Sequence, residues 1–129
     1  MMRLHLNFLS VVAILFVGLG IWLVLQPGAV EDLYPIRLDG PMAVSEIRAV
    51  FGGLMLGFGA AVLWLLWWVR RPMAAGMVTV FLFGGLLVAR VVGLVVEGVP
   101  TGPVLNETIF ETVVFFVVVF TTLKTHNRR

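Results

Sequence analysis

Residues 74–96 read AAGMVTVFLFGGLLVARVVGLVV, and this stretch contains a single charged side chain, that of Arg90. A bilayer core about 30 Å thick is crossed by roughly 20 apolar residues in a helix. Because lipid offers the backbone no hydrogen-bond partner, a segment of this length and polarity is expected to be a transmembrane helix. The stretch therefore predicts a membrane protein and leaves one charge that needs a physical reason.

Three further segments have the same character, at about residues 6–25, 44–69 and 103–123. The chain of 129 residues is 60% hydrophobic and only 12% charged, whereas a typical soluble domain has about 25% charged residues. The predicted fold class is all-α membrane: a four-transmembrane-helix up-down bundle that forms one domain over residues 1–129. The long first loop, about residues 27–43, is expected to carry a short interfacial piece around Leu33-Tyr34.

Lysine and arginine residues predict the orientation of the bundle. Most of them fall at one end of the predicted spans: Arg3, Arg70, Arg71, Lys124, Arg128 and Arg129. Arg37 lies in a loop on the opposite side, so the positive-inside rule predicts both termini in the cytoplasm. The expected location is a bacterial inner (plasma) membrane. We expect the first segment to be a retained span, because its apolar run is longer than that of a usual signal peptide.

Composition also excludes several classes of function. The chain has no cysteine, which excludes disulfides, thiolate metal sites and thiol catalysis. Basic residues do not form a stripe with interleaved aromatics, so no nucleic-acid partner is expected. His5 and His126 are expected to be solvated or interfacial at the cytoplasmic ends, whereas haem or metal sites would need histidines within the spans. We therefore expect no metal, no cofactor and no enzymatic activity.

Ionisable side chains gather in the outer halves of the predicted helices, and they form the candidate site: Glu46, Arg48, Arg90, Glu97 and Glu111. At about 1.5 Å per residue, Arg90 lies about 10 Å below Glu97. A charge at such depth costs about 2.5–3.5 kcal/mol, so it should face the bundle interior and find a partner. Glu107 and Glu111 are one helical turn apart and repel unless a cation intervenes. Arg90 is that cation, most simply through a pair with Glu111.

Three roles for this polar cluster remain open: fixing the register of the bundle, binding a polar headgroup or small ligand, and catalysis. The leading hypothesis is a non-enzymatic accessory, assembly or interaction subunit, with membrane lipid and a larger membrane protein complex or a homo-oligomer as partners. The alternative is a binder or carrier of a lipid, quinone or similar amphiphile. Its headgroup would meet Arg90 and Glu111, and its tail would lie along Phe83, Leu86 and Val114.

Glycines mark the helix faces that are expected to pack closely, namely Gly52, Gly53, Gly57 and Gly93. Gly53 and Gly57 form a small-xxx-small pair, and Gly52 lies on nearly the opposite face of the same predicted helix together with Gly59. Glycine allows helix backbones to approach closely within lipid. Packing inside the chain and packing against a second protein are both compatible with this pattern.

Three segments resemble an uncharacterised family of small bacterial four-helix membrane proteins, the domain of unknown function 4345. They are SEIRAVFGGLMLGFGA (45–60), VARVVGLVVEGVPTGP (88–103) and IFETVVF (109–115). The shared pattern consists of Glu46-x-Arg48, Gly52-Gly53, Gly57, Arg90-x-x-Gly93, Glu97-Gly98-x-Pro100 and Glu111. In architecture this family is similar to DoxX-like proteins, which include accessory subunits of membrane quinone oxidoreductases and assembly helpers. The resemblance implies the four-helix fold and the same polar cluster, and it carries no established activity.

Overall fold

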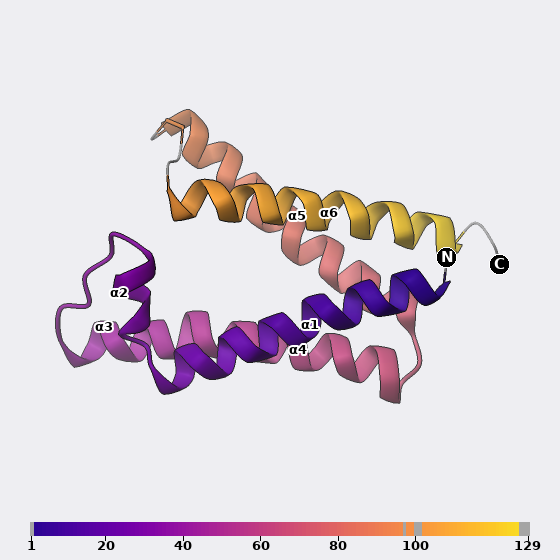
Figure 1. The fold of residues 1–129 in the computed structure, drawn as a ribbon, viewed down its shortest axis with the longest axis horizontal. Coiled ribbons are helices and arrows are strands. Elements are labelled where there is room, and N and C mark those ends of the chain that lie inside the picture. Colours follow the sequence, from indigo (N-terminus) through magenta and orange to yellow (C-terminus); the bar gives the residue numbers. More distant parts are fainter. Residues whose placement is uncertain (1, 97, 100–101, 127–129) are drawn as a thin grey trace.

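The computed structural model describes residues 2–96, 98–99 and 102–126, and the secondary-structure elements of these residues are all helices (Figure 1). Four helices are long and apolar enough to cross a membrane, which confirms the predicted fold class. The first is α1 (Met2–Leu25), the third is α5 (Pro72–Val96) and the fourth is α6 (Pro103–His126). The second is one continuous helix made of four consecutive segments: α3 (Gly40–Glu46), η1 (Ile47–Gly53), α4 (Leu54–Leu63) and η2 (Trp64–Trp68). The short helix α2 (Ala29–Leu33) lies in the first loop, where an interfacial piece was predicted.

Two of the helices differ from the sequence prediction at their starts. The first begins at Met2 rather than near residue 6, because Arg3 and Asn7 continue the helix with their side chains exposed. The second begins at Gly40, where Pro41 occupies an early helical position that suits its fixed φ angle. This second helix also contains two π-helical stretches, η1 and η2, which carry no signature in the hydrophobic pattern.

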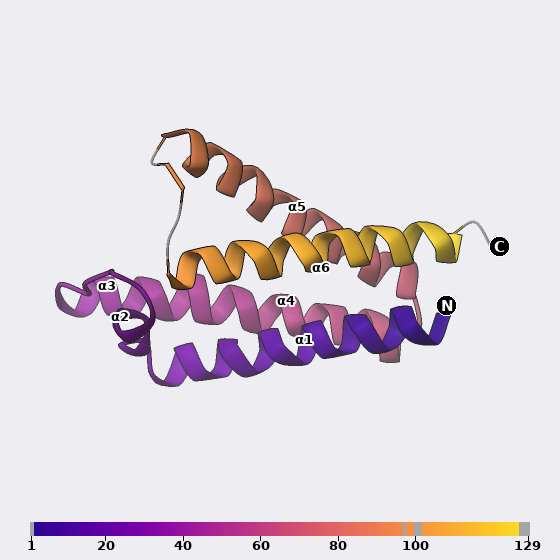
Figure 2. The same cartoon turned by 45° about the horizontal axis from the view of Figure 1, so that its top comes forward.

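The helices form two pairs that meet at one end and diverge toward the other (Figures 1 and 2). Helix α1 packs along η1 and α4, and α5 packs along α6. The start of α1, the end of α6 and the turn between η2 and α5 lie where the pairs meet, which we call the terminal end; the opposite end, with α2 and α3, is the loop end. The buried residues of α5 are Ala75, Gly76, Thr79 and Phe83, all in the half of the helix nearer the terminal end.

Glycines allow the backbones of the first pair to touch. A Cβ atom on Gly59 would lie 2.5 Å from the Ala13 carbonyl oxygen, and one on Gly52 would lie 2.8 Å from Val24 Cγ2. The predicted Gly53–Gly57 face is different, because a Cβ on Gly57 would meet nothing within 4 Å in the described part of the chain. Gly52 therefore lies against α1, whereas the Gly53–Gly57 face points away from the other helices. Gly93 is half-buried on α5.

Candidate functional site

An arginine and two glutamates join α5 to α6 in the half of the pair nearer the loop end. Arg90 Nε donates to Glu111 Oε2 at 2.9 Å, and Arg90 Nη2 donates to Glu111 Oε1 at 3.1 Å. The same Nη2 lies 3.2 Å from Glu107 Oε2. Two-point contact between a guanidinium and a carboxylate is the strong form of such a bond. The pair between Arg90 and Glu111 that the sequence predicted is thus present in the structure, with Glu107 as an additional member.

Helical spacing explains why these three side chains meet. Glu107 and Glu111 are one turn apart, so they share a face of α6. Val114 and Val118 continue that face toward the terminal end, and both are buried. The side chain of Glu111 is 12% exposed, that of Arg90 29% and that of Glu107 40%. Exposure therefore rises outward through the cluster, and Glu107 is its most open group.

The cluster lies within the membrane-spanning lengths of both helices. Arg90 precedes the end of α5 by six residues, or about 9 Å, and Glu111 follows the start of α6 by eight residues, or about 12 Å. With all three groups ionised, one positive and two negative charges leave a formal charge of −1. Within the described residues, Arg90 is the basic side chain that forms ion pairs with these carboxylates. The site thus has two carboxyl groups for one guanidinium at a depth where charge is costly.

The structure does not bring all of the predicted cluster together. Glu46 and Arg48 are exposed at the loop end of the composite second helix, and in the described part of the chain neither forms an ion pair. The structure does not join them to the Arg90 cluster, because the two helix pairs diverge at this end (Figure 1). Glu97 lies outside the described residues. Glu107 was left out of the candidate residues, although its spacing of four from Glu111 was the signal that could have placed it there.

Four phenylalanines form a chain of edge-on contacts that links all four long helices. Phe16 lies 4.9 Å from Phe58 and 5.7 Å from Phe83 between ring centroids, and Phe83 lies 6.5 Å from Phe110. Such edge-to-face geometry is favourable for aromatic rings. Phe83 is the last buried residue along α5 toward the loop end. The remaining turns of α5 present exposed apolar side chains, among them Val88, Val91, Val92 and Val95.

The histidine at the terminal end is buried, which corrects the prediction of a solvated side chain. His5 is fully buried on α1, with Nδ1 3.0 Å from Thr121 Oγ1 and Nε2 3.2 Å from the Pro72 carbonyl oxygen. The prediction was wrong because α1 begins at Met2, so His5 already lies inside the helix, between the start of α5 and the end of α6. Among the described residues, the side-chain hydrogen bonds between the two helix pairs both come from His5. The side chain of His126 lies outside the described part.

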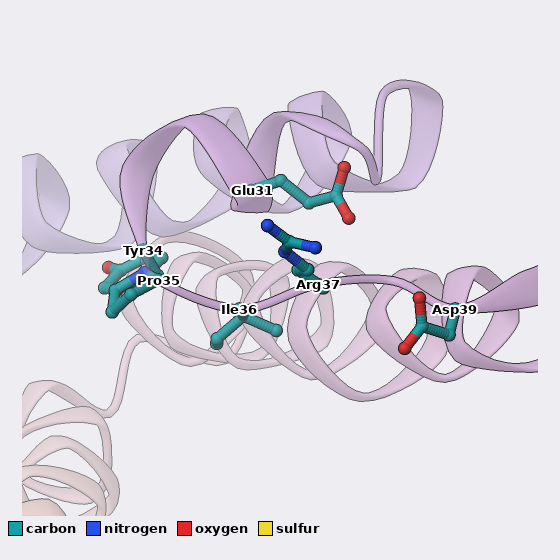
Figure 3. Close-up of a pocket in the computed structure, with 6 residues that line it drawn as sticks. All are labelled: Glu31, Tyr34, Pro35, Ile36, Arg37 and Asp39. Carbon is teal, nitrogen blue, oxygen red and sulfur yellow. The ribbon is translucent and has the colours of Figure 1, made fainter.

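An open pocket of about 550 Å³ lies in the first loop, apart from the Arg90 cluster. It is lined by Glu31, Tyr34, Pro35, Ile36, Arg37 and Asp39. Figure 3 shows the Arg37 side chain directed toward Glu31, while Asp39 lies farther along the loop. Glu31 Oε1 also accepts a hydrogen bond from the Leu38 backbone N–H, which ties α2 to the loop that follows. The pocket therefore belongs to the loop and contains none of the predicted site residues.

Comparisons with known proteins give one family. The model of a domain of unknown function (DUF4345) matches residues 5–122, which include most of each of the four long helices and the Arg90 cluster. Neither the curated proteins nor the solved structures contain a match to the chain.

Proposed function

The chain belongs to the DUF4345 family, and from that premise we propose that this small helical membrane protein is a non-enzymatic interaction subunit. It acts as an accessory or assembly component of a larger membrane complex, and it docks a transmembrane segment of its partner against the loop-end half of the α5–α6 pair. Both termini lie in the cytoplasm and the host membrane is a bacterial inner membrane, in keeping with the distribution of lysine and arginine.

The observation that carries this proposal is that the Arg90 cluster holds two carboxyl groups and a single basic side chain. Arg90 neutralises one carboxylate through its two-point contact with Glu111, and it reaches Glu107 through a single longer bond. The Glu107 side chain is 40% exposed at membrane depth. A partner helix that brings one basic side chain to Glu107 balances the charge, because ionic groups within membranes are stabilised by pairing with one another.

The apolar surface beside the cluster supports the same proposal. The loop-end half of α5 contains no buried residue, and its exposed side chains are mostly valine. Between helices in lipid there is no hydrophobic driving force, so association depends on close packing and on polar contacts. Short, stiff valine side chains around an ionic cluster provide both a packing surface and a specific polar contact.

The test is partner retention by the full chain extracted into nanodiscs and examined by native mass spectrometry. We expect the wild type to carry a second membrane protein and Glu107→Gln to retain about tenfold less of it, equivalent to about 1.4 kcal/mol. Glu46→Gln is the matched control, because Glu46 is an exposed glutamate on the other helix pair. Equal retention by Glu107→Gln and wild type, or a wild type that carries lipid alone, would reject the proposal.

A second candidate function, binding of an amphiphile, is favoured by the aromatic chain that lies beneath the ion cluster. The apolar tail of such a ligand cannot lie along Phe83 and Val114 as predicted from the sequence, since both side chains are buried in the core. Phe110 is exposed and contacts Phe83, so it is the aromatic residue that a tail would meet. Under this alternative, native mass spectra of the wild type show a bound lipid or quinone that Phe110→Ala loses and Phe120→Ala, an exposed phenylalanine of the same helix, retains.

A further inference from the structure

The terminal end contains a buried polar cluster that the proposed function does not use. Thr121 and Thr122 of α6 lie beside His5, and Thr125 follows one turn after Thr121 on the same helix; all three are nearly inaccessible to solvent. The hydroxyl oxygens of Thr122 and Thr125 are buried without a hydrogen-bond partner among the described residues. Buried hydroxyl groups in proteins are nearly always hydrogen-bonded, and ordered water often provides the partner. These two hydroxyls therefore indicate a site for water.

Gly76 explains how the cluster fits between three helices. A Cβ atom at this position would lie 2.5 Å from Thr122 Oγ1 and 3.0 Å from His5 Cε1. The Gly76 backbone thus forms the wall of α5 against which both side chains rest. The histidine ring and the Thr122 hydroxyl consequently lie next to each other, on the same side of α5.

The hydrogen bonds of His5 define where its protons lie. A carbonyl oxygen can only accept, so the contact with Pro72 requires a hydrogen on Nε2. The Thr121 hydroxyl can donate or accept, and its oxygen lies 2.8 Å from the Val117 carbonyl oxygen as well as 3.0 Å from His5 Nδ1. The neutral ring is therefore held as the Nε2–H tautomer, with Nδ1 accepting from Thr121.

The same geometry also accommodates the charged ring. If Nδ1 gains a proton, it donates to Thr121 Oγ1, and the Thr121 hydroxyl turns to donate to the Val117 carbonyl. Both ring nitrogens remain hydrogen-bonded in either state, and no heavy atom has to move. The hydrogen bonds of His5 therefore allow the ring to gain or lose a proton while the core stays closed.

We propose that the terminal end holds a hydrated proton-binding site, in which water bound by Thr122 and Thr125 connects His5 to the aqueous phase. Thr125 is one helical turn from Thr121 on the side nearer the chain terminus, a spacing that one water molecule can bridge. A hydronium ion there transfers its proton to Thr121 Oγ1, while the Thr121 hydroxyl proton passes to Nδ1. The products are water and an imidazolium ring, and the hydroxyl is regenerated.

The surroundings determine what the charged ring does to the bundle. At the terminal end, the charged residues on or beside the packed elements are Arg3 on α1, Arg70 and Arg71 before α5 and Lys124 on α6, all of them basic, whereas the acidic residues of α6, Glu107 and Glu111, lie toward the loop end. Within the described residues no carboxylate pairs with His5. His5 makes both side-chain hydrogen bonds between the helix pairs, and we call this contact at the terminal end the joint of the bundle. A charge on His5 is therefore located at the joint. Proton uptake there adds an unpaired positive charge among positive neighbours, which strains this joint.

The experiment is nitrogen NMR of the full chain labelled with ¹⁵N-histidine in nanodiscs of phosphatidylethanolamine and phosphatidylglycerol. At about pH 8 we expect the neutral Nε2–H tautomer for His5, and reversible conversion to imidazolium on acidification. We expect Thr122→Val combined with Thr125→Val to slow exchange of the His5 N–H with solvent by about tenfold or more, without changing the tautomer. Thr112→Val is the matched control, because Thr112 lies on α6 outside this cluster.

Three results would overturn the proposal: an Nδ1–H tautomer, loss of the fold before His5 becomes charged, or unchanged exchange in the double variant. If the double variant does not fold, the exchange rate of the His5 N–H is measured in the single variant Thr125→Val instead. Unchanged exchange in that variant, or an Nδ1–H tautomer in the wild type, would then overturn the proposal.

Discussion

Arg90 on α5 holds Glu111 on α6 by both carboxylate oxygens, with Nε 2.9 Å from Oε2 and Nη2 3.1 Å from Oε1. This contact fixes the rotation and the axial position of one helix against the other, because a planar guanidinium accepts a carboxylate in few orientations. The contact lies beyond Phe83, the last buried residue of α5, in the half of this helix that separates from α1 and α4 (Figure 2). The pair thus fastens a helix segment that has no other buried side chain.

Replacement of Arg90 by leucine should destabilise the protein strongly. The variant leaves Glu107 and Glu111 one turn apart without their cation, and loss of one partner of a largely buried pair costs about 3–5 kcal/mol. Thermal unfolding in detergent, followed by circular dichroism, measures the effect. Arg48→Leu should change the unfolding temperature little, since Arg48 is exposed. Similar losses for both variants would contradict a specific role for the Arg90 pair.

The two glutamates of the cluster should differ in their contribution to stability. Glu111→Gln removes two charge-assisted contacts from a nearly buried side chain, with an expected loss of about 1.5–3 kcal/mol. Glu107→Gln removes one longer contact from a half-exposed side chain, with an expected loss of about 0.2–1 kcal/mol. Unfolding free energies of the two purified variants give the order. The reverse order would mean that Glu107, rather than Glu111, is the main partner of Arg90.

Replacement of His5 by leucine should loosen the contact between the helix pairs. The variant removes both side-chain hydrogen bonds that join them and leaves the Pro72 carbonyl with one acceptor site unused, at a cost of about 1–3 kcal/mol. Hydrogen–deuterium exchange should increase at the start of α5 and the end of α6. Asn7→Leu, at an exposed position two residues away on α1, is the control. If exchange rises equally in both variants, His5 has no special role in the joint.

Two glycines of α4 should respond to alanine in opposite ways. In Gly59→Ala the new methyl group would lie 2.5 Å from the Ala13 carbonyl oxygen, so α1 must shift, with an expected cost of about 1–3 kcal/mol. In Gly57→Ala the methyl group meets nothing within 4 Å, and the higher helix propensity of alanine adds up to about 1 kcal/mol. Chemical unfolding of both variants tests the difference. A destabilised Gly57→Ala protein would indicate that this face is covered by a second molecule.

The spans and the pair between Arg90 and Glu111 could be predicted from the sequence, because both follow from helix periodicity and from the cost of charge in lipid. The placement of Glu46 and Arg48 could not, since it depends on the angle between helix pairs rather than on depth along one helix. His5 was misjudged for a related reason: its burial requires the start of α5 and the end of α6, which are far from it in the sequence.

The divergence of the helix pairs has a consequence for the surrounding bilayer. A fold that is narrow at one end and broad at the other displaces unequal numbers of lipids from the two leaflets (Figure 1). Lateral pressure in each leaflet then acts on the angle between the pairs, as it would on a wedge. We therefore expect the spacing of the two pairs at the loop end to respond to membrane curvature, while the hydrogen bonds of His5 hold the pairs together at the terminal end.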